Sequence, residues 1–275
     1  MDFNKSIFEN RKLLGRPFLA AHRGVCGANI PCNSIAAYKI ALSQGADVVE
    51  IDVSKSKDGE YFVFHPWMEP QFLKSKYLWE LTGDEIRELR LLNQDGVKTS
   101  YPVPTLEEVL LLLKDKVYIN VDKFWTDVEG ISNIIRKCGC EKQVIVKTHI
   151  EEESLNQVEK YAPDFMFVPM VWNEDNVTEK LKDRNINQIG IEVLFKKDDA
   201  PCISDEYIEE MHKKKMLIWT NSIIYNEAEI INGGHSDDYS VHTDPNKGWG
   251  WLIDKNIDFI QTDWLLSLKT YMLNR

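Results

Sequence analysis

Residues 48–53, Val-Val-Glu-Ile-Asp-Val, constrain the fold of this chain more than any other segment. β-Branched residues dominate the segment and turn residues flank it, which predicts a β-strand. Residues two apart in a strand share a face, so Glu50 and Asp52 should project together. Two adjacent carboxylates repel each other in a low dielectric unless a cation neutralises them, and Mg²⁺ or Ca²⁺ suits such an all-oxygen pair. The alternative is an edge strand whose polar face meets water.

Eight apolar, strand-like segments alternate with helical segments along the 275 residues. The predicted strands are 17–22, 48–53, 117–122, 144–147, 165–170, 189–194, 216–220 and 259–262. The predicted helices lie near 34–44, 106–113, 128–137, 151–161, 177–184, 205–214 and 265–273. Eight such strands, seven of them followed by a predicted helix, favour in a chain of this length an α/β fold of the TIM (β/α)8 barrel type over an open doubly wound sheet. We therefore expect a single barrel domain over residues 1–275.

Two regions depart from this alternation. Residues 61–65 form an extra extended run, and 66–103 lack a clear rhythm apart from a short helix at 82–91. We interpret 66–103 as a short insertion after strand 2. The connection 221–247 is much longer than the ~2–6 residues typical of such loops. It is expected on the C-terminal rim of the barrel, as a substrate-covering lid or as a plain surface excursion.

Charge and composition exclude several classes of protein. The formal charge of −11 argues against a nucleic-acid partner, since phosphate contacts need a basic surface. A small phosphate-bearing substrate stays compatible, because a bound metal can reverse the local sign of charge. The five cysteines are too few, and odd in number, for a disulfide framework. Without an apolar leader or a run of ~18–20 apolar residues, the chain is expected to be cytoplasmic and not inserted in a membrane. Its oligomeric state stays open.

Polar side chains gather where the predicted strands end. Catalytic groups of a barrel lie at the C-terminal ends of its strands and in the loops that follow. The positions there are His22, Arg23, Glu50, Asp52, Asp122, Lys147, Glu192, Trp219 and Asp263. Taken singly, most have a structural alternative: a core histidine or tryptophan, a helix cap, a solvated lysine or a strand-end salt bridge. Their concentration at one rim favours a functional site.

Several short motifs follow one another in a fixed order from about residue 18 to the C-terminus. They are His22-Arg23-Gly24, Pro31-Cys32-Asn33-Ser34, Gly45-Ala46-Asp47, Glu50-Ile51-Asp52-Val53, Lys57-Asp58-Gly59, His65, 103–108, Trp219-Thr220-Asn221 and 260–263. In order and spacing this set resembles the glycerophosphodiester phosphodiesterase family. The resemblance implies a TIM barrel that hydrolyses glycerophosphodiesters, with a divalent metal, to sn-glycerol 3-phosphate and an alcohol.

The resemblance also implies roles for individual residues. Glu50 and Asp52 become metal ligands, His22 and His65 the acid–base pair, and Arg23 a phosphate-binding residue. Such roles fit the chemistry, because a metal neutralises the phosphodiester and an imidazole near its ordinary pKa of ~6.5 can take up or release a proton. The third ligand is usually a Glu in the third strand. Here the matching inward carboxylate is Asp122, which shares a strand face with Tyr118 and Asn120.

The chain departs from the family pattern at four positions. Cys32 replaces a Glu, Pro66 replaces an Asp after His65, Asp122 replaces the third Glu, and Phe124 replaces a lysine. Lys123 is adjacent to Phe124, but strand alternation predicts that it points to the other face. Lys147 is then the candidate for the missing positive charge, with Trp219 and Glu192 as further candidate substrate contacts.

Two alternatives to a glycerophosphodiesterase stay open. A phospholipase D-like phosphodiesterase acting on lysophospholipid or sphingomyelin would need an apolar groove, which exposed aromatics at Trp67, Phe72 and Tyr77 could form. A catalytically silent binding protein that keeps the metal site is the other, and Cys32 and Pro66 favour it. In each case the partner is a small molecule.

Overall fold

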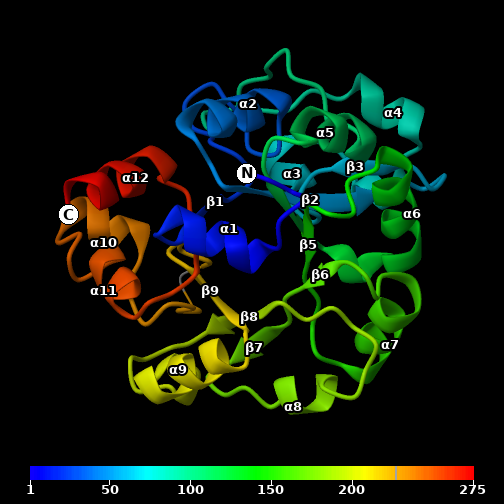
Figure 1. The fold of residues 1–275 in the computed structure, drawn as a ribbon. Coiled ribbons are helices and arrows are strands. Elements are labelled where there is room, and N and C mark those ends of the chain that lie inside the picture. The colour runs from blue at the N-terminus through cyan, green and yellow to red at the C-terminus, as the bar shows by residue number, and fades with distance from the viewer. Residues whose placement is uncertain (227) are drawn as a thin grey trace.

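Parallel strands form the centre of the molecule, and helices surround them (Figure 1). The computed structural model describes residues 1–226 and 228–275. The strands are β1 (Phe18–Ala21), β2 (Val48–Lys55), β3 (Tyr61–Val63), β4 (Tyr118–Asp122), β5 (Val144–Val146), β6 (Met166–Phe167), β7 (Met170–Trp172), β8 (Gly190–Leu194), β9 (Leu217–Asn221) and β10 (Phe259–Thr262). Paired neighbours run in the order β6-β5-β4-β2-β1-β10-β9-β8-β7, all parallel, with β3 antiparallel to β2.

The segment from β6 to β7 joins the two ends of this order. β6 pairs with β5, whereas β7 pairs with β8. Between them, Val168 donates its N–H to the carbonyl of Val146 (3.0 Å), and the carbonyl of Pro169 accepts from Glu192 N–H (2.9 Å). The strands therefore form a TIM-barrel-like ring, as predicted. The predicted strand 165–170 is split in two because Pro169 has no N–H to donate.

Most helices begin at the polar residues that the sequence indicates. Ser34 accepts from Ala37 N–H at the start of α2, and Thr105 with Glu108 forms the expected capping box of α5. The helices are α1 (Ile7–Leu14), α2 (Ile35–Gln44), α3 (Glu69–Phe72), α4 (Gly83–Glu88), α5 (Leu106–Leu113), α6 (Val128–Cys138), α7 (Glu152–Tyr161), α8 (Thr178–Leu181), α9 (Asp205–Lys213), α10 (Asp237–His242), α11 (Trp249–Asp254) and α12 (Leu265–Asn274). The sequence analysis missed α1, α3, α10 and α11, and α8 is shorter than predicted.

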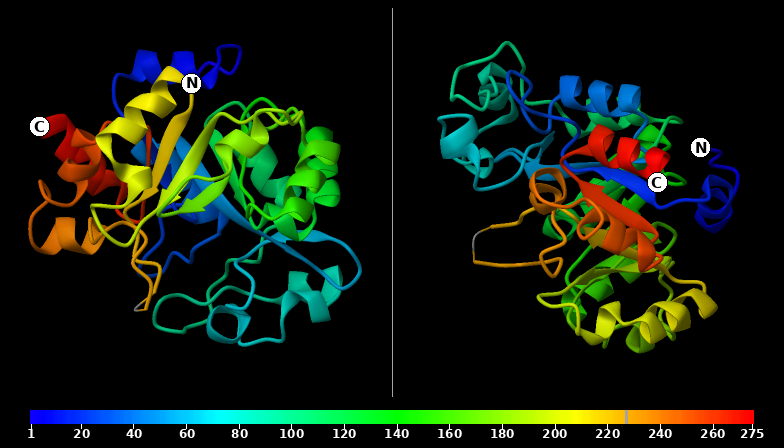
Figure 2. Two further views of the ribbon diagram at one scale, coloured as in Figure 1. Left: turned by 90° about the horizontal axis from the view of Figure 1, so that it is seen from below. Right: turned by 90° about the vertical axis from the view of Figure 1, so that its left-hand side faces the viewer.

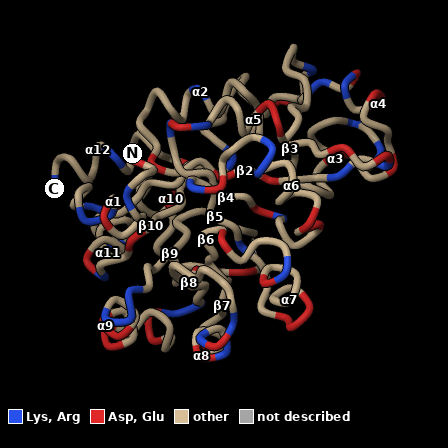
Figure 3. Tube along the Cα trace, turned by 45° about the vertical axis from the view of Figure 1, so that its right-hand side comes forward, with Lys and Arg blue, Asp and Glu red and all other residues tan. Residues whose placement is uncertain are grey.

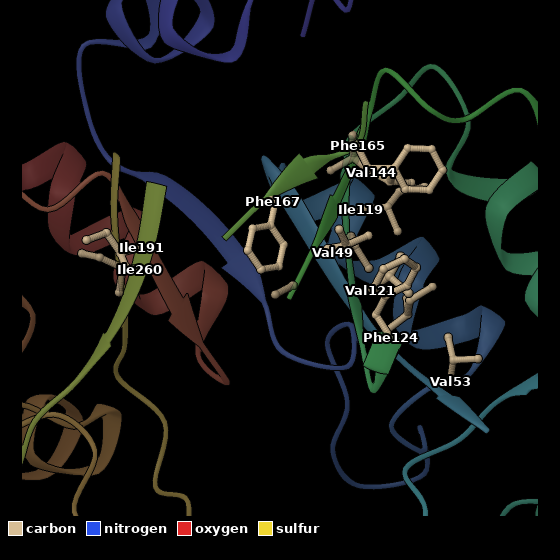
Figure 4. Close-up of a cluster of buried hydrophobic side chains, with 14 of the residues drawn as sticks. Val49, Val53, Ile119, Val121, Phe124, Val144, Phe165, Phe167, Ile191 and Ile260 are labelled. Carbon is tan, nitrogen blue, oxygen red and sulfur yellow. The ribbon is translucent and has the colours of Figure 1, made fainter. Parts of the chain in front are cut away.

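Alternate residues of each barrel strand face two different cores. Val49, Ile119 and Val121 belong to the larger cluster, which fills the space between strands and outer helices (Figure 4). Phe18, Tyr118, Trp219 and Phe259 belong to a second cluster together with Ile7 of α1. α1 thus covers the end of the barrel where the strands begin, and Asn10 Nδ2 donates to the Tyr118 hydroxyl (2.7 Å). Apolar side chains thus fill the lower interior, at the end of the barrel where the strands begin. Polar groups occupy the upper interior, at the end where the strands finish.

The region between β2 and α5 has a small core of its own. Phe64, Leu78, Ile86 and Leu91 are buried there, away from the two barrel cores. Both views of Figure 2 show that this region and the loop after β9 project from one end of the molecule, whereas α1 lies toward the other. Acidic and basic residues are mixed along outer helices such as α4, α8 and α9 (Figure 3).

The aromatic stack at the base of the barrel should dominate stability. The Phe259 ring lies 4.8 Å from that of Phe18 and 4.6 Å from that of Trp219. Phe259→Ala should lower the free energy of unfolding by about 3–5 kcal/mol, because it leaves a cavity among buried rings. Urea unfolding followed by circular dichroism measures this loss. The exposed Leu273 is the control, for which Leu273→Ala should change stability by less than about 0.5 kcal/mol. Equal effects of the two substitutions would contradict this packing.

Candidate active site

Three carboxylates converge at the C-terminal ends of β2 and β4. Asp52 and Asp122 are partners in the register of these two strands, and Glu50 lies on the same inward face of β2. One oxygen from each carboxylate lies within 4.8 Å of the others. Glu50 and Asp52 are buried, and Asp122 is partly exposed. The structure therefore brings together the three acids that the sequence analysis selected.

A network from β1 and α2 fixes the two buried acids. The backbone N–H of Arg23 donates to Glu50 Oε2 (2.7 Å), and Arg23 Nε lies 3.0 Å from Asp52 Oδ2. Asn33 Nδ2 also donates to Asp52 Oδ2 (2.8 Å), and the Tyr38 hydroxyl donates to Asn33 Oδ1 (2.7 Å). Arg23 has a φ of 56°, a left-handed conformation unusual for arginine, which lets its backbone and side chain serve both acids.

The acid cluster carries charge that its burial opposes. Burial, followed by the charges of Asp52 and Asp122, raises the pKa of Glu50 well above its ordinary range. Burial acts in the same direction on Asp52, but Arg23 and neighbouring cations hold the pKa of that carboxyl below its usual value. Asp52 Oδ1 is buried and accepts no hydrogen bond from the described residues. A buried anionic oxygen without a donor is suited to a cation.

A divalent cation fits this set of donors. Carboxylate oxygens are the ligands that Mg²⁺ and Ca²⁺ prefer. With all three carboxylates ionised, the two cationic side chains that they face, Arg23 and Lys123, leave one net negative charge. A divalent ion would change that to one net positive charge, equal and opposite to the charge of a phosphodiester.

The prediction that Lys123 points away from the site is wrong. Its Nζ lies 2.7 Å from Asp122 Oδ2 and 3.8 Å from Asp52 Oδ1. β4 ends at Asp122, and Lys123 has a φ of 60°, so strand alternation no longer applies and the side chain turns back. Burial opposes its charge, but Asp122 and Asp52 raise the pKa of Lys123. Lys123 thus brings to the site the charge that the sequence analysis sought from Lys147.

Lys147 is instead neutralised deeper in the barrel. It is buried, with Nζ 3.0 Å from Glu192 Oε2 and 3.6 Å from the centre of the Trp219 ring. Asn221 Nδ2 donates to the other oxygen of Glu192 (2.6 Å). Trp219 is fully buried, and its stacking on Phe259 makes it the boundary between apolar base and polar upper interior. A substrate contact of Lys147, Glu192 or Trp219 stays a prediction.

His65 follows β3 and presents one free nitrogen toward the acids. Its Nδ1 lies 2.8 Å from the carbonyl of Pro66, which can only accept, so Nδ1 carries the proton in the neutral ring. Nε2 then faces Asp52 Oδ1 at 4.0 Å. Burial lowers the pKa of His65, which favours the neutral ring. The backbone carbonyl of Pro66 thus orients the His65 ring.

His22 follows β1 and pairs with a carboxylate from the end of β10. Its Nδ1 lies 2.8 Å from Asp263 Oδ1, which leaves Nε2 for other partners. Burial opposes the charge of Asp263, yet the hydrogen bond with His22 holds its pKa below the ordinary value. The sequence analysis placed Asp263 at the rim without a role. Its partner could be found only from the pairing of β1 with β10.

Cys32 does not replace the missing carboxylate. A hydrogen bond with the Cys26 thiol, reinforced by burial, raises the pKa of Cys32 well above its ordinary value. The thiol is therefore neutral and adds no negative charge beside the acids. Asp122 nevertheless lies beside Glu50 and Asp52, and Arg23 contacts Asp52.

The long connection after β9 has an anchored part and an exposed tip. Asn232 Nδ2 donates to the carbonyl of Ile223 (3.1 Å), and a bridge joins Asn232 to Phe195 after β8. Ile224, Tyr225 and Ile230 of the tip are more than half exposed. The stretch predicted as a lid is thus largely fastened, and only the tip around 224–230, apart from the undescribed residue 227, projects freely.

The chain is similar in sequence to known glycerophosphodiester phosphodiesterases. A glycerophosphodiester phosphodiesterase of Caldanaerobacter subterraneus is 33% identical to the chain over 162 residues, which is 54% of this chain and 64% of the relative. The chain thus matches less than two thirds of that relative's length. The ordered motifs, the acid cluster and this relative agree. The chain is similar to glycerophosphodiester phosphodiesterases over about half of its length. A family model described only as a domain of unknown function matches residues 167–272.

Solved structures of glycerophosphodiester phosphodiesterases have a fold similar to that of this chain. A glycerophosphoryl diester phosphodiesterase of Parabacteroides distasonis superposes with a TM-score of 0.76, at 20% identity, over 94% of this chain and 87% of its own. An Oleispira antarctica phosphodiesterase in complex with the product sn-glycerol-3-phosphate gives a TM-score of 0.67 at 15% identity, over 94% and 98%. Among the described residues, no helix combines the length and apolar character needed to cross a membrane.

Removal of the Lys123 charge should strengthen metal binding. Two like unit charges about 4 Å apart repel each other by about 4 kcal/mol at an effective dielectric constant of about 20. Relief of even a third of that repulsion corresponds to about tenfold in affinity. Lys123→Met should therefore bind Mg²⁺ at least about tenfold more tightly in isothermal titration calorimetry. Lys39→Met, which removes an exposed lysine of α2, is the matched control and should leave the affinity unchanged. Unchanged or weaker binding by Lys123→Met would contradict a cation site at these acids.

Proposed function

We propose that the chain hydrolyses glycerophosphodiesters to sn-glycerol 3-phosphate and an alcohol, with Mg²⁺ or Ca²⁺ as cofactor. One observation carries this proposal: three carboxylates, two cationic side chains and an imidazole face one another at the C-terminal rim of a TIM-barrel-like fold. A second imidazole, His22, lies one residue before Arg23 at the same rim. The product named in the Oleispira complex supports the choice of substrate class.

The acids and cations divide the work of binding the phosphate. Glu50, Asp52 and Asp122 would hold the metal, which supplies a Lewis acid for the phosphate oxygens. Arg23 offers N–H donors, and Lys123 offers a compact ammonium close to the same acids. Together they would attract the anionic diester into a site that is otherwise acidic.

The two histidines would move the protons. Each has Nδ1 engaged by an acceptor, so each presents Nε2 for chemistry. One removes a proton from the attacking oxygen, and the other donates a proton to the departing alcohol, whose alkoxide would otherwise be a poor leaving group. Asp263 would stabilise His22 when it carries two protons. The Pro66 carbonyl would fix the tautomer of the neutral His65 ring, with the proton on Nδ1.

The proposal also includes the extent of the domain, its location and the residues around the substrate. The whole chain, residues 1–275, would act as one barrel domain, with 66–103 as an insertion after strand 2. The cytoplasm is the proposed location, and a small diester is the only partner required. Lys147 and Glu192 would form the polar floor under the substrate, with Trp219 supporting the lysine from below. The tip around 224–230 is the part of the long connection able to cover the bound substrate.

Loss of His22 or of the metal should stop catalysis. With glycerophosphocholine as substrate, His22→Ala should lower kcat by about 10²–10⁴-fold, the usual contribution of general acid–base catalysis. EDTA should abolish turnover, and Mg²⁺ or Ca²⁺ should restore it. His242→Ala, in which an exposed histidine of α10 is removed, is the control and should keep full activity. Wild-type protein that binds metal but hydrolyses no diester would instead be a silent binding protein.

A phospholipase D-like activity on lysophospholipid or sphingomyelin is the second candidate. One observation favours it: Trp67 and Trp79 are exposed, their ring centres lie 6.1 Å apart, and Tyr77 stacks on Trp79 at 4.3 Å. Trp67 follows His65 by two residues and has a left-handed φ of 69°. An apolar tail could therefore lie against these rings while the phosphate occupies the acid site. The predicted third aromatic, Phe72, is half-buried and packs in the small core instead.

Substrate comparison separates the two candidates. Our proposal predicts that kcat/KM for glycerophosphocholine exceeds that for lysophosphatidylcholine by at least about tenfold, because the glycerol hydroxyls are the part recognised by the polar floor. Choline release measured with both substrates, below the critical micelle concentration of the lipid, gives the ratio. A reversed ratio that falls after Trp67→Ala would favour the lipid substrate.

A further inference from the structure

A buried carboxylate lies at the start of α10, in the long connection that follows β9. Asp237 is 2% exposed and accepts four hydrogen bonds. Ser222 Oγ, Trp249 Nε1 and Thr262 Oγ1 each lie 2.7 Å from Asp237 Oδ1, and the backbone N–H of Asp263 donates to Oδ2 (2.8 Å). One carboxylate thus joins the ends of β9 and β10 to α11.

The bond to Asp263 links this carboxylate to the acid–base machinery. Asp263 is the residue whose side chain lies 2.8 Å from His22 Nδ1. The neighbouring N–H, of Trp264, donates to Thr262 Oγ1 (2.9 Å), the hydroxyl that itself donates to Asp237. The two successive backbone N–H groups after β10 are therefore both held, directly or through Thr262, by Asp237.

Asp263 needs such a support. Its side chain is 44% exposed, and among the described residues His22 is the only hydrogen-bond partner of its carboxylate. With a single side-chain contact, the position of this carboxylate depends on where its backbone is held. On the other side, β1 fixes His22, whose N–H donates to the carbonyl of Thr262 (3.2 Å). The separation of the two side chains thus depends on how rigidly residues 262–264 are held.

We propose that Asp237 is a positioning residue, which holds Asp263 at the distance and angle that orient the His22 imidazole. This inference rests on the proposed role of His22 in diester hydrolysis. It assigns the anchored part of the β9–α10 connection to the catalytic machinery and leaves only its exposed tip as a possible cover. A deletion of residues 234–244 would therefore remove a buried support together with any cover over the site.

The protonation state of Asp237 agrees with this role. Burial raises its pKa to about 6, although four donors oppose that shift by favouring the ionised form. Asp237 is consequently an acceptor on both oxygens at neutral pH. Asn has the same shape, but it turns an NH₂ toward one set of donors, so Asp237→Asn must break the clamp on one side.

A double-mutant cycle tests the proposal. A misplacement of about 1 Å can cost about 10²-fold in rate, so Asp237→Asn should lower kcat by roughly 10- to 10²-fold with little change in KM. Asp263→Asn should give a similar or larger loss. If Asp237 acts through Asp263, the double variant should be no slower than Asp263→Asn alone. A double variant in which the losses of kcat of the two single variants multiply would overturn the proposal. If Asp237→Asn does not fold, Ser222→Ala, which removes a single donor to Asp237, replaces it in the double-mutant cycle.

A matched control comes from the other end of the barrel. Asp258 is also buried and accepts from a backbone N–H of β9, that of Ile218 (2.9 Å), as well as pairing with Arg11 (2.9 Å) and His212 (2.8 Å). Asp258→Asn should lower the thermal stability as Asp237→Asn does, but leave kcat of the folded protein unchanged. An equal loss of kcat in both variants would mean that Asp237 is only structural.

A measurement without substrate separates this inference from the proposed function. The Nδ1–H proton of His22, assigned by its loss in His22→Ala, should give a downfield NMR signal in the wild-type protein. That signal should shift or broaden in Asp237→Asn and persist in Asp258→Asn. The same signal in Asp237→Asn as in the wild type would overturn the positioning role. Absence of hydrolysis by the wild-type protein would overturn the proposed function alone.

Discussion

The site depends on the burial of two like charges on the inward face of one strand. Glu50 and Asp52 cannot both stay ionised in a low-dielectric interior without cations close by. Arg23 and Lys123 meet part of that need, and each has a left-handed backbone conformation that brings it to the acids. Asn33 also donates to Asp52 Oδ2, and the Tyr38 hydroxyl holds Asn33 in turn. The cost of this arrangement is explained by function, since stability alone would favour apolar residues at these positions.

The barrel interior is divided to make that burial possible. Rings of Phe18, Tyr118 and Phe259 fill the lower half, and α1 closes it. Trp219 lies at the boundary, below the Lys147–Glu192 pair. Above it, Glu50, Asp52 and Asp122 face inward near the strand ends, where loops bring His22 and His65. The apolar half supplies stability, whereas the polar half concentrates charge where a phosphodiester would bind.

The sequence predicted the parts of this arrangement that follow from strand periodicity. Alternation placed Glu50, Asp52 and Asp122 on the inward face, and eight apolar segments indicated the barrel. Periodicity could not predict Lys123, because its direction depends on a left-handed residue beyond the end of the strand. It also missed Asp237, which lies 26 residues before its partner Asp263 and meets it only through the pairing of β9 with β10. The sequence analysis allowed a salt bridge at Glu192 but could not name Lys147 as its partner, because the two strands are distant in sequence.

Binding of sn-glycerol 3-phosphate with and without a divalent cation tests the central claim most directly. If the acid cluster holds a cation that attracts the phosphate, saturating Mg²⁺ or Ca²⁺ should tighten binding of this product by at least about tenfold. By linkage the product should tighten cation binding by the same factor. Calorimetric titrations in both orders, with Asp52→Asn as the variant that should abolish the coupling, would measure it. Equal product affinity with and without the cation would contradict the account.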